Sequence, residues 1–71
     1  MNTLYVCKVP TQLKALQNVA WVNPDIPIAT IIIDDTEYPV IHDDKIPINS
    51  IAVNYILRQN HNLTIGQPIS L

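Results

Sequence analysis

The stretch SIAVNYILRQNHNLTIGQPISL, residues 50–71, decides the fold that this sequence predicts. Ile51 to Val53 has the apolar character of a core strand. Asn54 suits a helix N-cap, because its side chain can accept a hydrogen bond from an otherwise unpaired amide. Tyr55 to His61 then fits a polar helix of about two turns. Gly66 permits the positive φ of a turn before a closing strand, and a helix between two strands in this order predicts a small interlocked β-barrel.

Length and composition favour one small domain built from strands. The chain has 71 residues, of which 48% are hydrophobic and 14% charged. Its apolar residues are mostly isoleucine, valine and leucine, and β-branched side chains pack well on a pleated sheet. Six prolines punctuate the chain at short intervals. We therefore predict a single mainly β domain over residues 1–71, a barrel of about six short strands with one short helix at 55–61.

The middle of the chain predicts a hairpin. Ala29 to Ile33 is a continuous apolar run, which indicates a strand buried on both faces. Asp34 to Glu37 is a polar turn, and Tyr38 to Ile41 returns as the second strand. His42 to Lys45 is expected as an exposed loop. Ile46 to Ile48 is expected to be extended, because its central proline cannot donate to a ladder.

Two short strands are predicted before this hairpin. Leu4 to Val9 largely alternates apolar and polar residues, and Val19 to Val22 is a short apolar run that ends at an Asn-Pro turn. Between them, Gln12 to Gln17 suits either one helical turn or an open loop. Trp21 suits either the aromatic filling of the core or a contact patch, since the chain has no phenylalanine.

Charge and cysteine content exclude several classes of protein. The net charge is −2 with only four Lys and Arg residues, too few to neutralise the phosphates of a nucleic acid, so no nucleic-acid partner is predicted. Cys7 is the single cysteine, which rules out an internal disulfide and suits a reducing compartment. No apolar run approaches the ~20 residues of a membrane span. We expect a cytoplasmic protein without a membrane span.

Neither catalysis nor a cofactor is predicted. Two acidic loops, 34–37 and 42–44, contain oxygen and nitrogen ligands, but their spacing is typical of a solubilising surface rather than a metal site. Asp35-Thr36 is followed by glutamate, where an aspartic protease needs glycine. Cys7 lies on a predicted strand without a basic activator. The chain also has no phosphate-binding P-loop motif.

Arg58 is the main candidate for binding a partner. It stands on the predicted helix of an otherwise acidic chain, with Tyr55, Gln59 and His61 close by in sequence. An exposed arginine beside an aromatic surface is a common interface anchor, and a solvated helix charge is the alternative. Together with the loop around His42, these residues form the predicted partner-binding face.

Several short sequence motifs follow one another along the chain. They are PT at 10–11, LQNVAWVN at 16–23, III at 31–33, IP at 46–47, IA at 51–52, Arg58, and LTIGQ at 63–67. In this order and spacing, the chain resembles the first subdomain of the N-terminal domain of N-ethylmaleimide-sensitive factor, an AAA ATPase that disassembles SNARE complexes. Valosin-containing protein carries a related subdomain. The resemblance implies a double-psi β-barrel that binds SNAP-like or ubiquitin-pathway adaptors.

The chain departs from that family on its predicted helix. Leu57 stands where the family has glutamine, Gln59 where the factor has a basic residue, and Asn60 where it has tryptophan. In the family, basic residues are implicated in gripping the acidic end of the SNAP adaptor, and Arg58 alone matches such a position. With a net charge of −2, we expect weak electrostatic attraction to an acidic partner.

Two functions follow as hypotheses. The first is a stand-alone, non-catalytic interaction module that mimics or competes with the N-domain of the ATPase in vesicle trafficking or protein quality control. The second is a structural or homo-oligomeric barrel, for example an assembly or coat component, because a solitary copy should expose apolar surface. The vocabulary rich in isoleucine and asparagine suggests a viral or bacterial mimic, which would act in the host cytoplasm.

Overall fold

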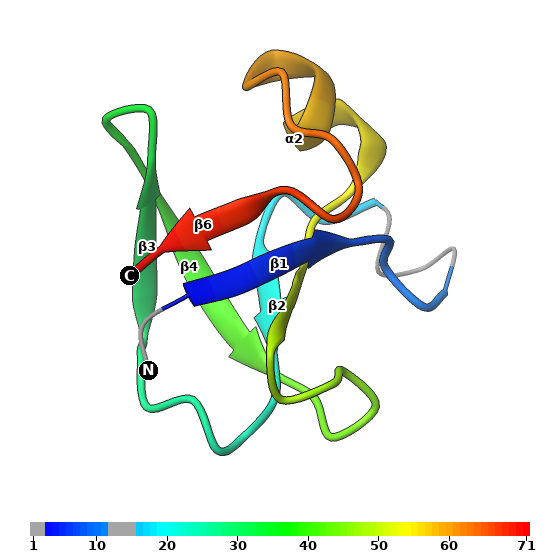
Figure 1. Ribbon diagram of the computed structural model, residues 1–71, viewed down its shortest axis with the longest axis vertical. Helices are drawn as coiled ribbons and strands as arrows, with labels where there is room; N and C mark the ends of the chain where they lie inside the picture. Colours follow the sequence, from blue (N-terminus) through cyan, green and yellow to red (C-terminus); the bar gives the residue numbers. More distant parts are fainter. Residues whose placement is uncertain (1–2, 12–15) are drawn as a thin grey trace.

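The computed structural model describes residues 3–11 and 16–71 and shows a mainly β protein (Figure 1). Within these residues, six strands form one curved sheet, a half-barrel, with a short helix between the last two strands. The elements are β1 (Thr3–Cys7), β2 (Ala20–Val22), β3 (Thr30–Ile33), β4 (Thr36–His42), β5 (Ser50–Ala52), α2 (Tyr55–Asn60) and β6 (Pro68–Ser70). This confirms the predicted fold class. The prediction for 12–17 falls mainly on residues 12–15, which lie outside the described residues.

The order of the strands interlocks the two halves of the chain. The sheet runs β3-β4-β2-β5-β1-β6. Among the described strands, those of the first half, β1 to β3, therefore have neighbours only from the second half, β4 to β6, and the reverse also holds. β1–β5 and β2–β4 are parallel, whereas β2–β5, β1–β6 and β3–β4 are antiparallel. The two halves are related by a simple exchange. If β1 is exchanged with β4, β2 with β5 and β3 with β6, the same strand pairs result, with the same parallel or antiparallel directions. Neither half can therefore build any part of this sheet alone.

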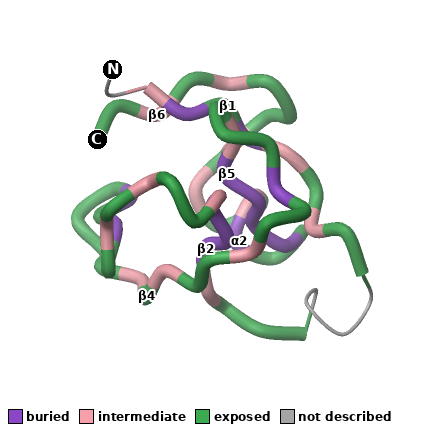
Figure 2. The backbone as a smooth tube through the Cα atoms, turned by 90° about the horizontal axis from the view of Figure 1, so that it is seen from below, coloured by how far each residue is buried: buried purple, intermediate pink, exposed green. Residues whose placement is uncertain are grey.

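The hydrophobic core is centred on β1, β2 and β5, which hold most of the buried strand residues (Figure 2). The main cluster of buried side chains comprises Leu4, Val6, Ala20, Val22, Ile31, Ile33, Ile51, Val53 and Leu57. A second cluster contains Trp21, Ile46 and Ala52. The burial of Trp21 confirms its interpretation as core filling. Each large aliphatic residue buried here contributes roughly 1.5–3 kcal/mol to the free energy of folding.

β3 is buried on one face only. Ile31 and Ile33 lie in the core, while Ile32 between them is 64% exposed. The expectation of a strand buried on both faces is therefore wrong. The physical reason is that one face of β3 packs on the main core cluster, whereas the second cluster, which buries Trp21 and Ala52, includes no residue of β3.

The β3–β4 turn is shorter than predicted. Asp34 and Asp35 alone form it, with φ of 49° and 66°, and Thr36 already pairs with Ile33. Two successive left-handed residues are typical of a type I′ hairpin turn, and aspartate tolerates this conformation better than most residues. The hairpin itself is confirmed.

The segment 46–48 is not extended, contrary to the prediction. The amide of Ile46 donates to the carbonyl of Asp43 at 3.1 Å, and the amide of Ser50 donates to the carbonyl of Pro47 at 3.0 Å. These two turns bring the side chain of Ile46 into the second core cluster. Burial of this large side chain therefore accompanies a bent backbone, which the local sequence did not indicate.

Asn54 is the N-cap of α2, as predicted. Its Oδ1 accepts a hydrogen bond from the amide of Leu57 at 2.8 Å, and its side chain is almost fully buried. Its Nδ2 donates to the carbonyl of Gln17 at 3.2 Å and to Oδ1 of Asn18 at 3.0 Å. One side chain thus starts the helix and ties it to the segment before β2.

The turn at Gly66 joins the end of the chain to β1. Gly66 has a φ of +89°, which confirms the predicted need for glycine at this turn. Its amide donates to the carbonyl of Val6 at 2.8 Å, and the amide of Val6 donates to the carbonyl of Gln67 at 2.9 Å. These bonds align β6 beside β1.

We predict that Asn54→Ala lowers the free energy of unfolding by about 2–4 kcal/mol, since it removes the N-cap and leaves buried partners unsatisfied. Urea unfolding followed by circular dichroism measures this change. Asn60→Ala, at the exposed end of the same helix, is the matched control and should stay within about 0.5 kcal/mol of the parent. Equal losses in both variants would contradict the structural role of Asn54.

Candidate binding groove

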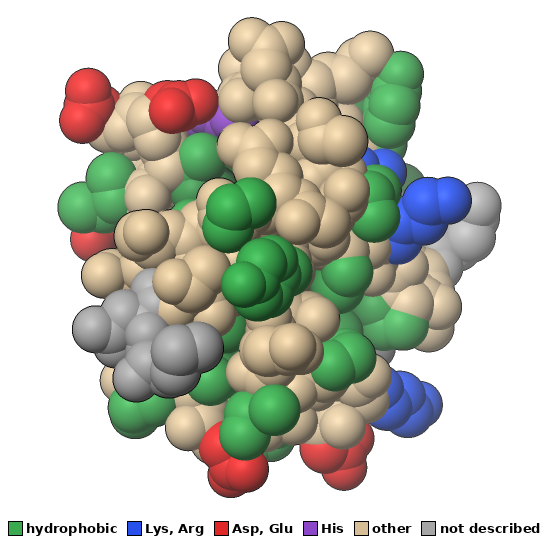
Figure 3. Space-filling view, in the orientation of Figure 1, with side chains coloured by type: hydrophobic (Ala, Val, Ile, Leu, Met, Phe, Trp, Pro, Cys, Tyr) green, Lys and Arg blue, Asp and Glu red, His purple; other side chains and the backbone are tan. Residues whose placement is uncertain are grey.

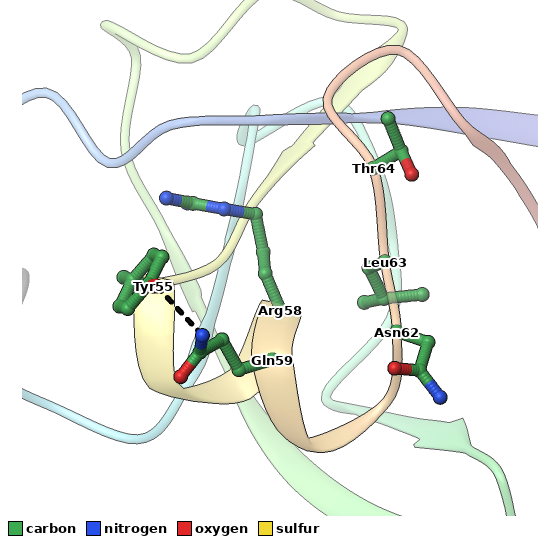
Figure 4. Close-up of a pocket in the computed structure, with 6 residues that line it drawn as sticks. All are labelled: Tyr55, Arg58, Gln59, Asn62, Leu63 and Thr64. Carbon is green, nitrogen blue, oxygen red and sulfur yellow. Dashed lines mark hydrogen bonds between the residues drawn. The ribbon is translucent and has the colours of Figure 1, made fainter.

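A groove lies between α2 and the loop that follows it (Figure 4). Its volume is about 420 Å³, and its lining residues are Tyr55, Arg58, Gln59, Asn62, Leu63 and Thr64. The helix supplies three of them and the loop supplies the other three. Three predicted binding residues, Tyr55, Arg58 and Gln59, therefore come together on one wall.

Arg58 is held in position by two contacts. Its Nη1 donates a hydrogen bond to the carbonyl of Val53, and its guanidinium carbon lies 5.9 Å from the centre of the Tyr55 ring. This second contact is a cation–π interaction. A guanidinium has five N–H donors, so donors beyond the one used by Val53 can face a ligand. The arrangement is a half-buried cation beside an aromatic ring.

The opposite wall depends on how α2 ends. Asn62 has a left-handed φ of 53°, which turns the chain back along the helix. The amide of Leu63 then donates to the carbonyl of Arg58 at 2.7 Å, and the amide of Thr64 donates to Oε1 of Gln67 at 3.0 Å. On the helical wall, Nε2 of Gln59 donates to the Tyr55 hydroxyl at 2.6 Å. Both walls are thus braced by hydrogen bonds.

His61, a predicted binding residue, faces away from this groove. Its side chain is only 9% exposed. Its Nε2 lies 2.6 Å from the Tyr38 hydroxyl, and its Nδ1 lies 3.1 Å from Oδ2 of Asp34. A neutral ring that donates from Nδ1 and accepts at Nε2 satisfies both contacts. His61 therefore bridges the end of α2 to the β3–β4 hairpin.

His42, the remaining predicted binding residue, lies far from the groove. It is the last residue of β4, and its Nε2 donates to the carbonyl of Ile26 at 2.8 Å. β4 is seven residues long, so its two ends are about 20 Å apart. His61 contacts the hairpin end of β4, whereas His42 lies at the other. The structure does not bring these two histidines together.

The same separation applies to the acidic loops. Asp34, Asp35 and Glu37 lie at the hairpin end of β4, and Asp43 and Asp44 follow its other end. Among residues 3–11 and 16–71, no group of three or more His, Cys, Asp or Glu side chains gathers to hold a metal ion. Nor does this part of the chain contain a helix long and apolar enough to cross a membrane.

Burial dominates the environment of the Cys7 thiol. Burial raises the pKa of the Cys7 thiol above its ordinary value, while a hydrogen bond with Ser50 and the charge of Arg58 lower it. The charge of Arg58 therefore acts on the thiol without activating it, which agrees with the prediction that Cys7 has no basic activator. Burial still dominates, so the thiol form prevails at neutral pH.

Comparison with known proteins assigns no identity: no protein-family model and no curated protein matches this chain. The candidate site therefore stands on its geometry. Sequence reasoning missed its loop wall, Asn62 to Thr64. The signal available for that wall was the short segment Asn62 to Ile65 between the predicted helix and Gly66, which indicates a turn without fixing its direction.

We predict that Arg58→Met raises the pKa of the Cys7 thiol further, because the cation that stabilises the thiolate is lost. The pH profile of alkylation by iodoacetamide should shift to higher pH, while Lys45→Met should leave it in place. Since the folded-state pKa is raised, the contribution of Cys7 to stability is full below the unfolded-state pKa and is lost as pH rises through the folded-state pKa. An unchanged profile in Arg58→Met would show that Arg58 does not act on Cys7.

Proposed function

We propose that this chain is a non-catalytic interaction module that binds an adaptor protein through the α2 groove. The observation that carries the proposal is the Arg58–Tyr55 pair, which is fixed before any partner arrives. A guanidinium held over an aromatic ring loses little conformational freedom on binding, and both residue types are frequent energetic hot spots of interfaces. Gln59 beside them adds a polar group that can orient a ligand.

We further propose that the half-barrel is a double-psi barrel of the type found in the N-domains of N-ethylmaleimide-sensitive factor and valosin-containing protein. The alternation of strands from the two halves and the parallel β1–β5 and β2–β4 pairs support this assignment. So does the place of α2 between β5 and β6. Two of the stretches that resemble this family are Arg58 and residues 63–67. They lie in the groove and at the Gly66 turn.

The partner class follows from that resemblance: a SNAP-like or ubiquitin-pathway adaptor. In this role the chain mimics or competes with the full ATPase and acts in the cytoplasm, or in the host cytoplasm if it is a viral or bacterial mimic. The net charge of −2 gives little long-range attraction to an acidic protein. We therefore expect an affinity that depends on short-range contacts and changes little with salt.

Titration calorimetry with a purified SNAP adaptor, and separately with a ubiquitin-pathway adaptor of valosin-containing protein, tests the proposal. At least one should bind, and Arg58→Met should weaken that binding by about tenfold or more. Lys45→Met, which removes an exposed cation outside the groove, is the matched control and should stay within about twofold of the parent.

Urea unfolding of both variants separates loss of binding from loss of the fold, because Arg58 also bonds to Val53. Binding to neither adaptor would overturn the proposed partner class. Equal weakening by both variants would instead overturn the groove as the site.

A homo-oligomeric or structural role is the second candidate, favoured by the exposed apolar surface. Large hydrophobic side chains with substantial exposure include Tyr5, Leu16, Ile32, Ile48, Ile56, Ile65 and Leu71. Figure 3 shows several hydrophobic side chains over the middle of one face, with acidic groups at its upper left and along its lower edge. Apolar side chains that gather in this way, rather than standing singly, are typical of association surfaces.

The oligomeric role predicts a mass above that of the monomer. Sedimentation equilibrium over a rising series of protein concentrations measures it, and the apparent mass should reach a dimer or a larger closed species. A constant monomer mass across the series would exclude this second candidate and leave the adaptor-binding role.

A further inference from the structure

β3 and β6 are the two edges of the sheet. Among residues 3–11 and 16–71, β3 pairs only with β4, and β6 pairs only with β1. Because Ile33 and Thr36 flank a two-residue turn, they exchange hydrogen bonds, and such bonding recurs at every second residue of an antiparallel pair. The bond from the amide of Val40 to the carbonyl of Ala29, at 2.9 Å, agrees with this alternation. The N–H and C=O groups of Thr30 and Ile32 therefore point away from β4.

A cavity lies beside these outward-facing groups. It has a volume of about 300 Å³ and is lined by Ile28, Thr30, Ile31 and Ile32 on the β3 side and by Ser70 and Leu71 at the end of β6. Donors and acceptors of the backbone thus border a largely apolar cavity. This combination suits a ligand that offers both a peptide backbone and an apolar side chain.

The β3 edge is only four residues long, but it lacks the charged residues, proline and bulge that also protect edge strands. Natural edges carry charged residues, proline or a bulge that discourage pairing with another chain. β3 reads Thr-Ile-Ile-Ile, with none of these, and exposes Ile32. β6 by contrast begins with Pro68, whose nitrogen has no hydrogen to donate. The edge open to pairing is therefore β3.

We propose that the free edge of β3 binds one extended segment of a partner polypeptide by antiparallel β-strand addition. The backbone of the segment pairs with Thr30 and Ile32. One of its apolar side chains enters the cavity between β3 and β6. This site is separate from the α2 groove and does not depend on the function proposed for it.

The shape of the cavity favours a single segment over a second copy of the chain. Ser70 and Leu71 form a wall facing β3. If two folded copies paired through their β3 edges, Ser70 and Leu71 of each copy would obstruct the approach of the β3 edge of the other. An isolated extended segment carries no such wall and can lie between the two.

Charge indicates the composition of the segment. Asp34, Asp35 and Glu37 surround the end of β3. In an antiparallel arrangement, the amino end of the bound segment lies beside this acidic turn. A basic residue there is favoured by its proximity to the two aspartates. The segment is therefore a short β-branched stretch preceded by lysine or arginine.

The test uses the acetylated and amidated peptide Lys-Thr-Ile-Thr-Ile-Thr and two versions that are N-methylated at alternate residues. Each methylated version blocks the amides of one edge of the peptide strand. Binding is followed by NMR titration of the full chain. The parent peptide should shift the amide signals of Thr30 and Ile32 and slow their hydrogen exchange. One methylated peptide should bind like the parent, and the other should bind about tenfold more weakly or worse.

Variants of the protein provide the second measurement. Ile32→Lys places a charge on the edge and should weaken peptide binding by about tenfold or more. Ile56→Lys is the matched control, because Ile56 is 55% exposed, comparable to Ile32, but lies on α2. It should change the affinity by less than about twofold. The dispersion of amide signals shows that each variant is folded.

Three outcomes would overturn the proposal. The parent peptide does not bind, both methylated peptides bind equally, or the shifted amides belong to the α2 groove. Protection of the Thr30 and Ile32 amides without peptide, in a chain that sediments as a dimer, would show that β3 pairs with a second copy instead.

Discussion

Every strand of this protein depends on neighbours from the other half of the chain. β1, β2 and β3 never contact one another within the sheet order, and neither do β4, β5 and β6. The first half of the chain therefore cannot form a hairpin before the second half folds. Only β3–β4 is a local pairing, and the other four pairs close long stretches of chain before their hydrogen bonds form. Such topology favours slow, cooperative folding.

The local features of the fold were predictable, and the long-range ones were not. The β-branched runs indicated strands, Asn54 marked the start of α2, and Gly66 marked a turn, because each signal acts within a few residues. The exposure of Ile32 depends on how far the second core cluster extends across the sheet, and that cluster includes no residue of β3. The bend at Ile46 depends on a core cluster built from distant segments. Neither the exposure of Ile32 nor the bend at Ile46 can be predicted from the neighbouring residues in the sequence.

The candidate site was also predictable only in its local contacts. Tyr55, Arg58 and Gln59 share a helix, so their proximity followed from sequence spacing. His61 follows the same helix, yet its side chain bonds to Asp34 and Tyr38 of the hairpin. Those partners are far away in sequence, and only the folded sheet brings them near. The contacts of His61 also fix the α2 groove relative to the β3–β4 hairpin. The groove and the hairpin are therefore held in one arrangement.

Thr3 pairs with Ser70, so both ends of the described sheet meet at one corner, beside the β3 edge (Figure 1). A label or fusion partner attached after Leu71 would emerge there and crowd the β3 edge while leaving α2 clear. Thr3 and Ser70, which pair directly, are also close enough to be joined by a short linker. New ends could then be opened in an exposed loop, such as the one after His42, to give a circularly permuted chain with the same sheet.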